Sequence, residues 1–216
     1  MAKNKDLVEL SPEELAAFKL EMYSQVPLAR AQIRSLRAQA EAAADLVGDA
    51  TDHDAIGRVL TSVMLAGFAL ELGLKIFPMT YGSKRPRGHN LRKLFDELPE
   101  QIRNDISASY AASTFPKPLV LIYALISTKE QPQVPEGVRR ARYDTAENVI
   151  EHSADAFTKA RYFFEDVRAA DWVTISHGVH YMLVLSHILD VVYDEYLKRG
   201  GWAHAPAGVE PPNASA

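Results

Sequence analysis

The chain has 216 residues, of which 47% are hydrophobic and 24% are charged, and its formal net charge is −4. This composition is that of an ordinary globular protein, which excludes a disordered or fibrous chain, and the net charge gives no general attraction to nucleic acid. The absence of cysteine excludes disulfides, a thiol nucleophile and cysteine-ligated metal sites.

The length fits one domain. We expect a flexible N-terminus over residues 1–10, a helical bundle over residues 11–199 and a disordered tail over residues 200–216. Residues 1–10 are polar and do not resemble a signal peptide. No later segment approaches the roughly 20 apolar residues that cross a bilayer, so a cytoplasmic protein without membrane contact is predicted.

The first two helices are predicted from capping residues and proline positions. Ser11, Pro12 and Glu14 form a capping-box start, so a helix should begin near Pro12. It is expected to bend at Pro27, which lacks a backbone donor, and to continue to about residue 47. The next helix should span residues 55–77 and end before Pro78. Its apolar residues surround most of the helix, which is typical of a central buried helix.

Later elements follow the apolar spacing. Leu91, Leu94, Phe95 and Leu98 predict a short amphipathic helix, and Pro99 starts another. The apolar run 119–126 fits a buried helix or a strand, and helix is favoured because no second strand is predicted; the fold of residues 114–143 is otherwise open. A capping box at Asp144 and Glu147 predicts a helix over residues 145–170, followed by a last helix over 172–198 that ends at Gly200 and Gly201. The predicted fold is all-α, a single up-and-down bundle of four to five main helices with additional short ones.

Four charged residues stand out on two of these helices. Glu71 and Lys75 lie four positions apart in the nearly apolar central helix, with the glutamate first, which favours an ion pair. Arg161 and Glu165 repeat this spacing on a later helix, with Tyr162 between them. We expect the four charges to form one interhelical network. The network is either a structural clamp or a functional site.

A basic loop precedes one helix start. Lys84, Arg85 and Arg87 lie just before His89, where free backbone N–H groups favour an anion. The loop is either a phosphate-binding site or solvated surface, since no Walker or dinucleotide motif accompanies it. His89 either belongs to this site or caps the following helix.

The last predicted helix carries a polar stripe opposite its apolar arc. Ser176, His180, His187 and Asp194 fall on one face, with His177 beside them. The imidazoles suit acid–base chemistry or a pH-sensitive dimer face. His180 and His187 are two turns apart, too distant to hold one metal ion by themselves, and neither a metal nor a cofactor is predicted.

Three ordered segments resemble a known family. Glu71-Leu72-Gly73-Leu74-Lys75, Gly88-His89-Asn90-Leu91 and Ala160-Arg161-Tyr162-Phe163-Phe164-Glu165 are similar to elements of one branch of the HEPN superfamily (higher eukaryotes and prokaryotes nucleotide-binding). Arg142-Tyr143 is a second match for the Arg-Tyr element. The resemblance implies a helical bundle that is often dimeric and is found in defence, toxin–antitoxin and RNA-processing systems.

Many proteins of that superfamily are metal-independent ribonucleases that use an Arg and a His near the start of a late helix. Here Arg168 and His177 have eight residues between them, more than the motif allows, and Arg85 and His89 have three, which is fewer. The chain therefore departs from the ribonuclease pattern.

The leading prediction is a HEPN-like module that binds a nucleotide, RNA or a partner protein, in a bacterial defence or toxin–antitoxin system. A homodimer is expected, and a separate nucleotidyltransferase or an antitoxin is the expected partner. One alternative is a metal-independent endoribonuclease in which His177 or His180 transfers protons and Arg168 stabilises the phosphorane. The other is a purely structural interaction protein.

Overall fold

A computed structural model of the chain describes residues 11, 13–14, 17, 20–21, 24–45, 53–81, 87–113, 122–127, 143–161 and 172–199. Four longer helices dominate this part: α2 (Val26–Asp45), α3 (His53–Tyr81), α5 (Glu100–Ala112) and α10 (Val179–Lys198). Three short helices, α4 (Leu91–Asp96), α7 (Ala146–His152) and α8 (Ala156–Arg161), and two strands, β1 (Ile122–Ser127) and β2 (Trp172–His177), accompany them. The described residues 13–14, 17, 20–21 and 24 are helical as well.

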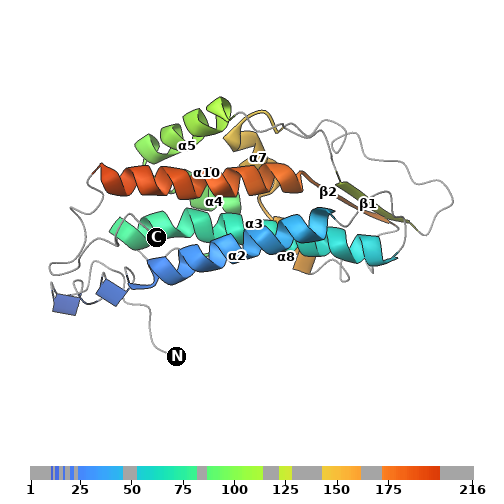
Figure 1. Ribbon diagram of the computed structural model, residues 1–216, viewed down its shortest axis with the longest axis horizontal. Coiled ribbons are helices and arrows are strands. Elements are labelled where there is room, and N and C mark those ends of the chain that lie inside the picture. The colour runs from blue at the N-terminus through green and yellow to red at the C-terminus, as the bar shows by residue number, and fades with distance from the viewer. Residues whose placement is uncertain are drawn as a thin grey trace.

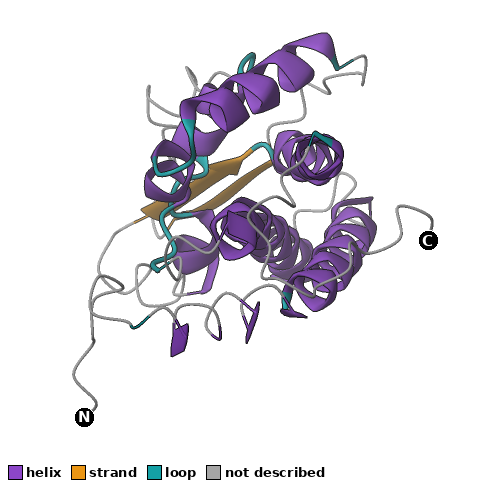
Figure 2. Cartoon of the chain, turned by 90° about the vertical axis from the view of Figure 1, so that its left-hand side faces the viewer, coloured by secondary structure: helices purple, strands orange, loops and turns teal. Residues whose placement is uncertain are grey.

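Helix α3 is the centre of the bundle (Figure 1). It packs against α2, α10, α8 and α4, and α10 packs in turn against α5 and α7. By the colour order in Figure 1, α2 runs antiparallel to α3, and α5 runs antiparallel to α10. Figure 2 views several of these helices nearly end-on, with the two strands beside them. The predicted all-α, up-and-down bundle is confirmed, with the two-stranded ribbon as an addition.

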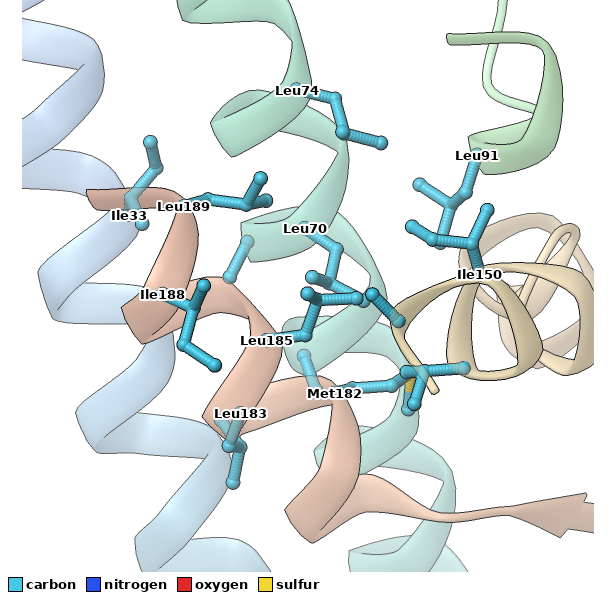
Figure 3. Close-up of a cluster of buried hydrophobic side chains, with 14 of the residues drawn as sticks. Ile33, Leu70, Leu74, Leu91, Ile150, Met182, Leu183, Leu185, Ile188 and Leu189 are labelled. Carbon is cyan, nitrogen blue, oxygen red and sulfur yellow. The ribbon is translucent and has the colours of Figure 1, made fainter. Parts of the chain in front are cut away.

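The core lies between α3 and α10, where apolar side chains from five helices meet (Figure 3). Several of them are fully buried: Ile33 from α2, Leu70 and Leu74 from α3, Leu91 from α4, Ile150 from α7, and Met182, Leu185 and Leu189 from α10. A Cβ on Gly73 would lie 2.9 Å from Leu189 Cδ1, so the missing side chain lets α10 approach α3 closely. The predicted apolar arc of α10 is therefore the face that packs on α3.

The apolar character of α3 has a second consequence. Residues 57–80 are long and apolar enough to cross a membrane by length and composition, so the expectation that no segment approaches such a length is corrected. More than half of that stretch is buried inside the bundle, as in the core helix of a globular protein.

The predicted helix start at Ser11 is confirmed, but the predicted bend at Pro27 is not. The Ser11 amide donates to the Glu14 carboxylate (2.8 Å) and the Glu14 amide donates to Ser11 Oγ (3.2 Å), which is the reciprocal bonding of a capping box. A turn at Gln25 then separates this start from α2, so Pro27 lies in the first turn of a new helix, where a missing N–H costs little, and does not bend a continuous one.

The predicted end of α3 before Pro78 is wrong, because the helix continues to Tyr81 with Pro78 inside it. Proline removes one backbone hydrogen bond. The following turn stays helical, and Thr80 Oγ1 donates to the Ile76 carbonyl (2.8 Å) and shares a 2.6 Å hydrogen bond with the Tyr193 hydroxyl of α10. Burial of this turn against α10 thus outweighs the local preference to stop.

The predicted helix over the run 119–126 is wrong where the structure describes it. Strand β1 pairs antiparallel with β2, with Ile122 opposite His177 and Ser127 opposite Trp172. The last helix accordingly begins at Val179 and not at residue 172. The β-branched residues Val173, Thr174 and Ile175 favour extended backbone, but the partner strand lies far away in the sequence, so neither segment reveals the pairing alone.

The predicted single helix over 145–170 is interrupted. A turn at residues 153–155 separates α7 from α8. Thr145, not Asp144, is the N-cap of α7 and accepts from the Asn148 amide (3.1 Å), while Glu147 accepts from Ser107 of α5. The predicted flexible and disordered ends, 1–10 and 200–216, lie outside the described residues, as do residues 162–171.

Candidate functional site

A buried carboxylate lies on the central helix. The Glu71 side chain is 2% exposed, between the core residues Leu70 and Leu74 of α3. Lys75, one turn later, places its Nζ 2.6 Å from Glu71 Oε1 and is 16% exposed. The predicted ion pair is present. A buried charge is costly without partners, so the other groups that contact the Glu71 carboxylate matter for the role of this pair.

The second partner of the carboxylate is His89. Its Nδ1 lies 3.0 Å from Glu71 Oε1 and 3.1 Å from Oε2. An ionised carboxylate only accepts hydrogen bonds, so Nδ1 carries the proton and donates it. The His89 side chain is 61% exposed, and because the two ring nitrogens point in divergent directions, Nε2 faces away from Glu71. Glu71, Lys75 and His89 together are called the Glu71 cluster below.

The loop that carries His89 is held in place by its neighbours. Gly88 has φ +84°, a conformation that favours glycine. Asn90 accepts from the Lys93 amide (3.0 Å) as the N-cap of α4, and its side chain donates to Asp155 (2.9 Å). The alternative that His89 caps α4 is therefore wrong, because Asn90 does so. His89 is free of that role and bonds the core helix instead.

An aromatic pair lies beside the imidazole. The Phe157 ring of α8 stacks on Phe68 of α3 at 5.1 Å and lies 5.8 Å from the His89 ring. A Cβ on Gly67 would lie 3.0 Å from the Phe157 backbone nitrogen, so the glycine allows α8 to pack this close. The cluster thus combines a buried carboxylate, a lysine ammonium group and an imidazole, with an aromatic ring beside it.

The structure brings together only part of the predicted site. Glu71, Lys75 and His89 meet, and Arg87 is exposed on the same loop. Lys84 and Arg85 lie outside the described residues. The same holds for Tyr162, Glu165 and the side chain of Arg161, so the four-charge network stays a prediction, although α8 does pack against α3.

The predicted histidine stripe is not continuous. Ser176 and His177 belong to strand β2, so they do not share a helical face with the others. His180 is half-buried in the first turn of α10, and His187 is exposed, with its Nδ1 3.4 Å from Arg37 Nη1 of α2. Arg168 lies outside the described residues. The angular spacing that placed His177 beside His180 is therefore wrong, because the helix starts later.

An ion-pair group between α2 and α10 was not predicted. Arg30 Nη2 lies 2.6 Å from Asp190 and Nη1 lies 2.9 Å from Asp194, and the guanidinium is 5.2 Å from the Tyr193 ring centre. Burial lowers the pKa of Arg30, but the hydrogen bonds and charges of the two aspartates outweigh it and raise the pKa overall. The sequence does contain one sign of this group, because Asp190 and Asp194 lie four positions apart and so share a face of α10. It does not show that their cation, Arg30, comes from α2.

No group of three or more His, Asp or Glu side chains gathers as metal ligands within the described ranges. Comparison of the chain with protein-family models, with curated proteins and with solved structures gives no match.

Proposed function

We propose that this protein is a HEPN-like helical module that binds a phosphate-bearing ligand, a nucleotide or RNA, at the Glu71 cluster. The observation that carries the proposal is the carboxylate of Glu71, which is 2% exposed and holds Lys75 and the exposed His89 in fixed positions. A buried charge that orients an exposed imidazole is the arrangement of a pre-organised site, since the orienting bond is formed before any ligand arrives.

The charges around the cluster suit an anion. Lys75 neutralises Glu71, and its side chain keeps 16% exposure. His89 adds a second ring nitrogen, which donates when the imidazole is protonated, and Arg87 follows the basic residues Lys84 and Arg85 in the sequence. Phosphate oxygens are bound by such sets of Lys, Arg and His donors. The Phe157 ring offers a surface on which a base can stack.

The biological setting is supported by the resemblance alone. The ordered Glu-x-x-x-Lys and Gly-His-Asn-Leu elements point to a cytoplasmic protein of a defence or toxin–antitoxin system. Its expected partners are a second copy of this chain and a separate nucleotidyltransferase or antitoxin.

The test is direct binding of AMP and of a short single-stranded RNA to the purified protein, by calorimetry and by thermal unfolding. A ligand at 100 times its dissociation constant stabilises the folded state by about 2.7 kcal/mol, which is a measurable rise in Tm. We expect His89→Gln to weaken binding, and Arg92→Gln to leave it unchanged. Arg92 is the matched control because it lies on the neighbouring helix α4, paired with Asp96.

Two outcomes would count against the proposal. If no phosphate-bearing ligand changes the Tm of the wild type, the cluster is a structural clamp and the protein is an interaction module. If RNA incubated in EDTA is cleaved, and cleavage is lost in His177→Ala/His180→Ala but kept in His89→Gln, the ribonuclease alternative takes first place.

A further inference from the structure

Histidine protonation decides the charge of the Glu71 cluster. Glu71 contributes −1 and Lys75 contributes +1, so these two groups cancel. With a neutral His89 the cluster has no net charge, and with an imidazolium it has a charge of +1. The net charge of the cluster that an approaching phosphate meets, zero or +1, therefore depends on one proton.

The hydrogen bond to Glu71 fixes which atom that proton occupies. Nδ1 already donates to the carboxylate at 3.0 Å and 3.1 Å. A neutral imidazole with its proton on Nδ1 has a lone pair on Nε2, which repels a phosphate oxygen. Only the imidazolium donates from both nitrogens, one to Glu71 and one to the ligand.

We infer that the Glu71 cluster binds a phosphate group only when Nε2 of His89 is protonated, so that ligand binding takes up a proton. This inference rests on the proposed function and adds the state of the site that is competent to bind. His89 is then a bridge: its inner nitrogen is held by a carboxylate of the core helix, and its outer nitrogen contacts the ligand.

The surroundings of His89 are consistent with this role. The charged groups that face it among the described residues are Glu71 and Lys75 from α3, with Arg87 two positions earlier on its own loop. From α8 it meets the uncharged ring of Phe157, and the nearby Asp155 is bonded to Asn90. The buried carboxylate holds the imidazole ring in one orientation through these two contacts.

The experiment measures phosphate binding and proton uptake together. Two probes are used: AMP, which has a terminal phosphate, and a dinucleoside monophosphate, which has only a phosphodiester. The diester is needed because a phosphate monoester itself titrates near pH 6, whereas the diester keeps one charge. Binding is measured from about pH 5.5 to about pH 8.5, the range in which histidines change charge, in buffers that differ in ionisation enthalpy.

For the wild type we expect the affinity to fall by up to about tenfold per pH unit at the alkaline end, with uptake of up to about one proton per ligand. His89→Asn places an amide near the position of Nδ1, so it can still donate to Glu71 but has no group at the position of Nε2. It should bind weakly, without proton uptake. His187→Asn, which changes an exposed histidine of α10, should behave as the wild type.

The outcomes separate the two proposals. Binding of the dinucleotide identifies an RNA backbone as the source of the phosphate, and binding of AMP alone identifies a nucleotide. Proton uptake supports the inference directly for the dinucleotide, and for AMP only where the wild type takes up more protons than His89→Asn. If the wild type binds either probe without proton uptake, and His89→Asn binds equally well, this inference is wrong and the proposed function stands. If neither probe binds, the proposed function fails with it.

Discussion

Replacing Lys75 with methionine tests whether the buried carboxylate depends on its ammonium partner. Methionine is unbranched and apolar, so it fills similar space without the charge. The change leaves the carboxylate of Glu71, 2% exposed, with His89 as its remaining partner. Loss of one member of a buried ion pair costs about 3–5 kcal/mol. The remaining hydrogen bond to the imidazole offsets part of this cost, since hydrogen bonds to charged groups contribute about 1.5–3 kcal/mol.

We therefore expect Lys75→Met to lower the free energy of unfolding by about 2–3 kcal/mol. The assay is urea unfolding followed by circular dichroism, where an m-value of about 2 kcal/mol per M turns this loss into a midpoint shift of roughly 1–1.5 M. Lys93→Met, an exposed lysine on α4, is the matched control and should shift the midpoint little.

A double substitution sharpens the test. Glu71→Leu/Lys75→Met removes both charges, and a buried ion pair replaced by apolar groups is often close to neutral in stability. The double variant should thus be more stable than Lys75→Met alone. If Lys75→Met costs no more than Lys93→Met, or if the double variant is the less stable one, the carboxylate does not need the ammonium group and the reasoning is refuted.

Two glycines of α3 form a matched pair for a second prediction. Gly67→Ala should destabilise the protein by about 1–3 kcal/mol, because the new Cβ would lie 3.0 Å from the backbone nitrogen of Phe157. Gly57→Ala adds a Cβ with nothing within 4 Å, so it should stabilise the protein by about 0.5–1 kcal/mol. Equal effects of the two changes on thermal unfolding would contradict this packing. Burial raises the pKa of Tyr110 above its ordinary value of 10.0, so the folded state keeps the proton while the unfolded chain loses it, and stability should fall as the pH rises above 10. Tyr110→Phe loses the 2.8 Å hydrogen bond to the Tyr143 carbonyl, about 1 kcal/mol at neutral pH, and its stability should approach that of the wild type in alkali; a constant difference across the pH range would speak against the shift.

The helical part of the fold was predictable where local signals agree. The capping residues Ser11 and Glu14, the apolar surface of α3 and the apolar arc of α10 each depend on residues close in sequence, and each is confirmed. Pro78 shows the limit of such rules, since a buried turn bonded to Tyr193 of α10 continues the helix past it. That contact joins residues far apart in the chain, so no local pattern contains it.

The candidate site was predictable as a pair and not as a cluster. The i, i+4 spacing of Glu71 and Lys75 predicts their ion pair. The approach of His89 depends on the path of the loop after α3 and on its attachment to Asp155 through Asn90. The prediction of a continuous histidine stripe was wrong for a related reason. His177 pairs with Ile122 in the ribbon, and no local pattern around His177 shows that it pairs with so distant a segment.

The ribbon has a consequence for the order of folding. Its strands enclose residues 128–171, a segment that includes α7 and α8, so pairing must close a long loop and pay the corresponding loss of chain entropy. Two isolated strands are at most marginally stable in water. The ribbon should therefore form after the helices have assembled, and its amide protons should exchange with solvent sooner than those of α3. Since β2 leads through Gly178 directly into α10, completion of the ribbon fixes where the last helix begins.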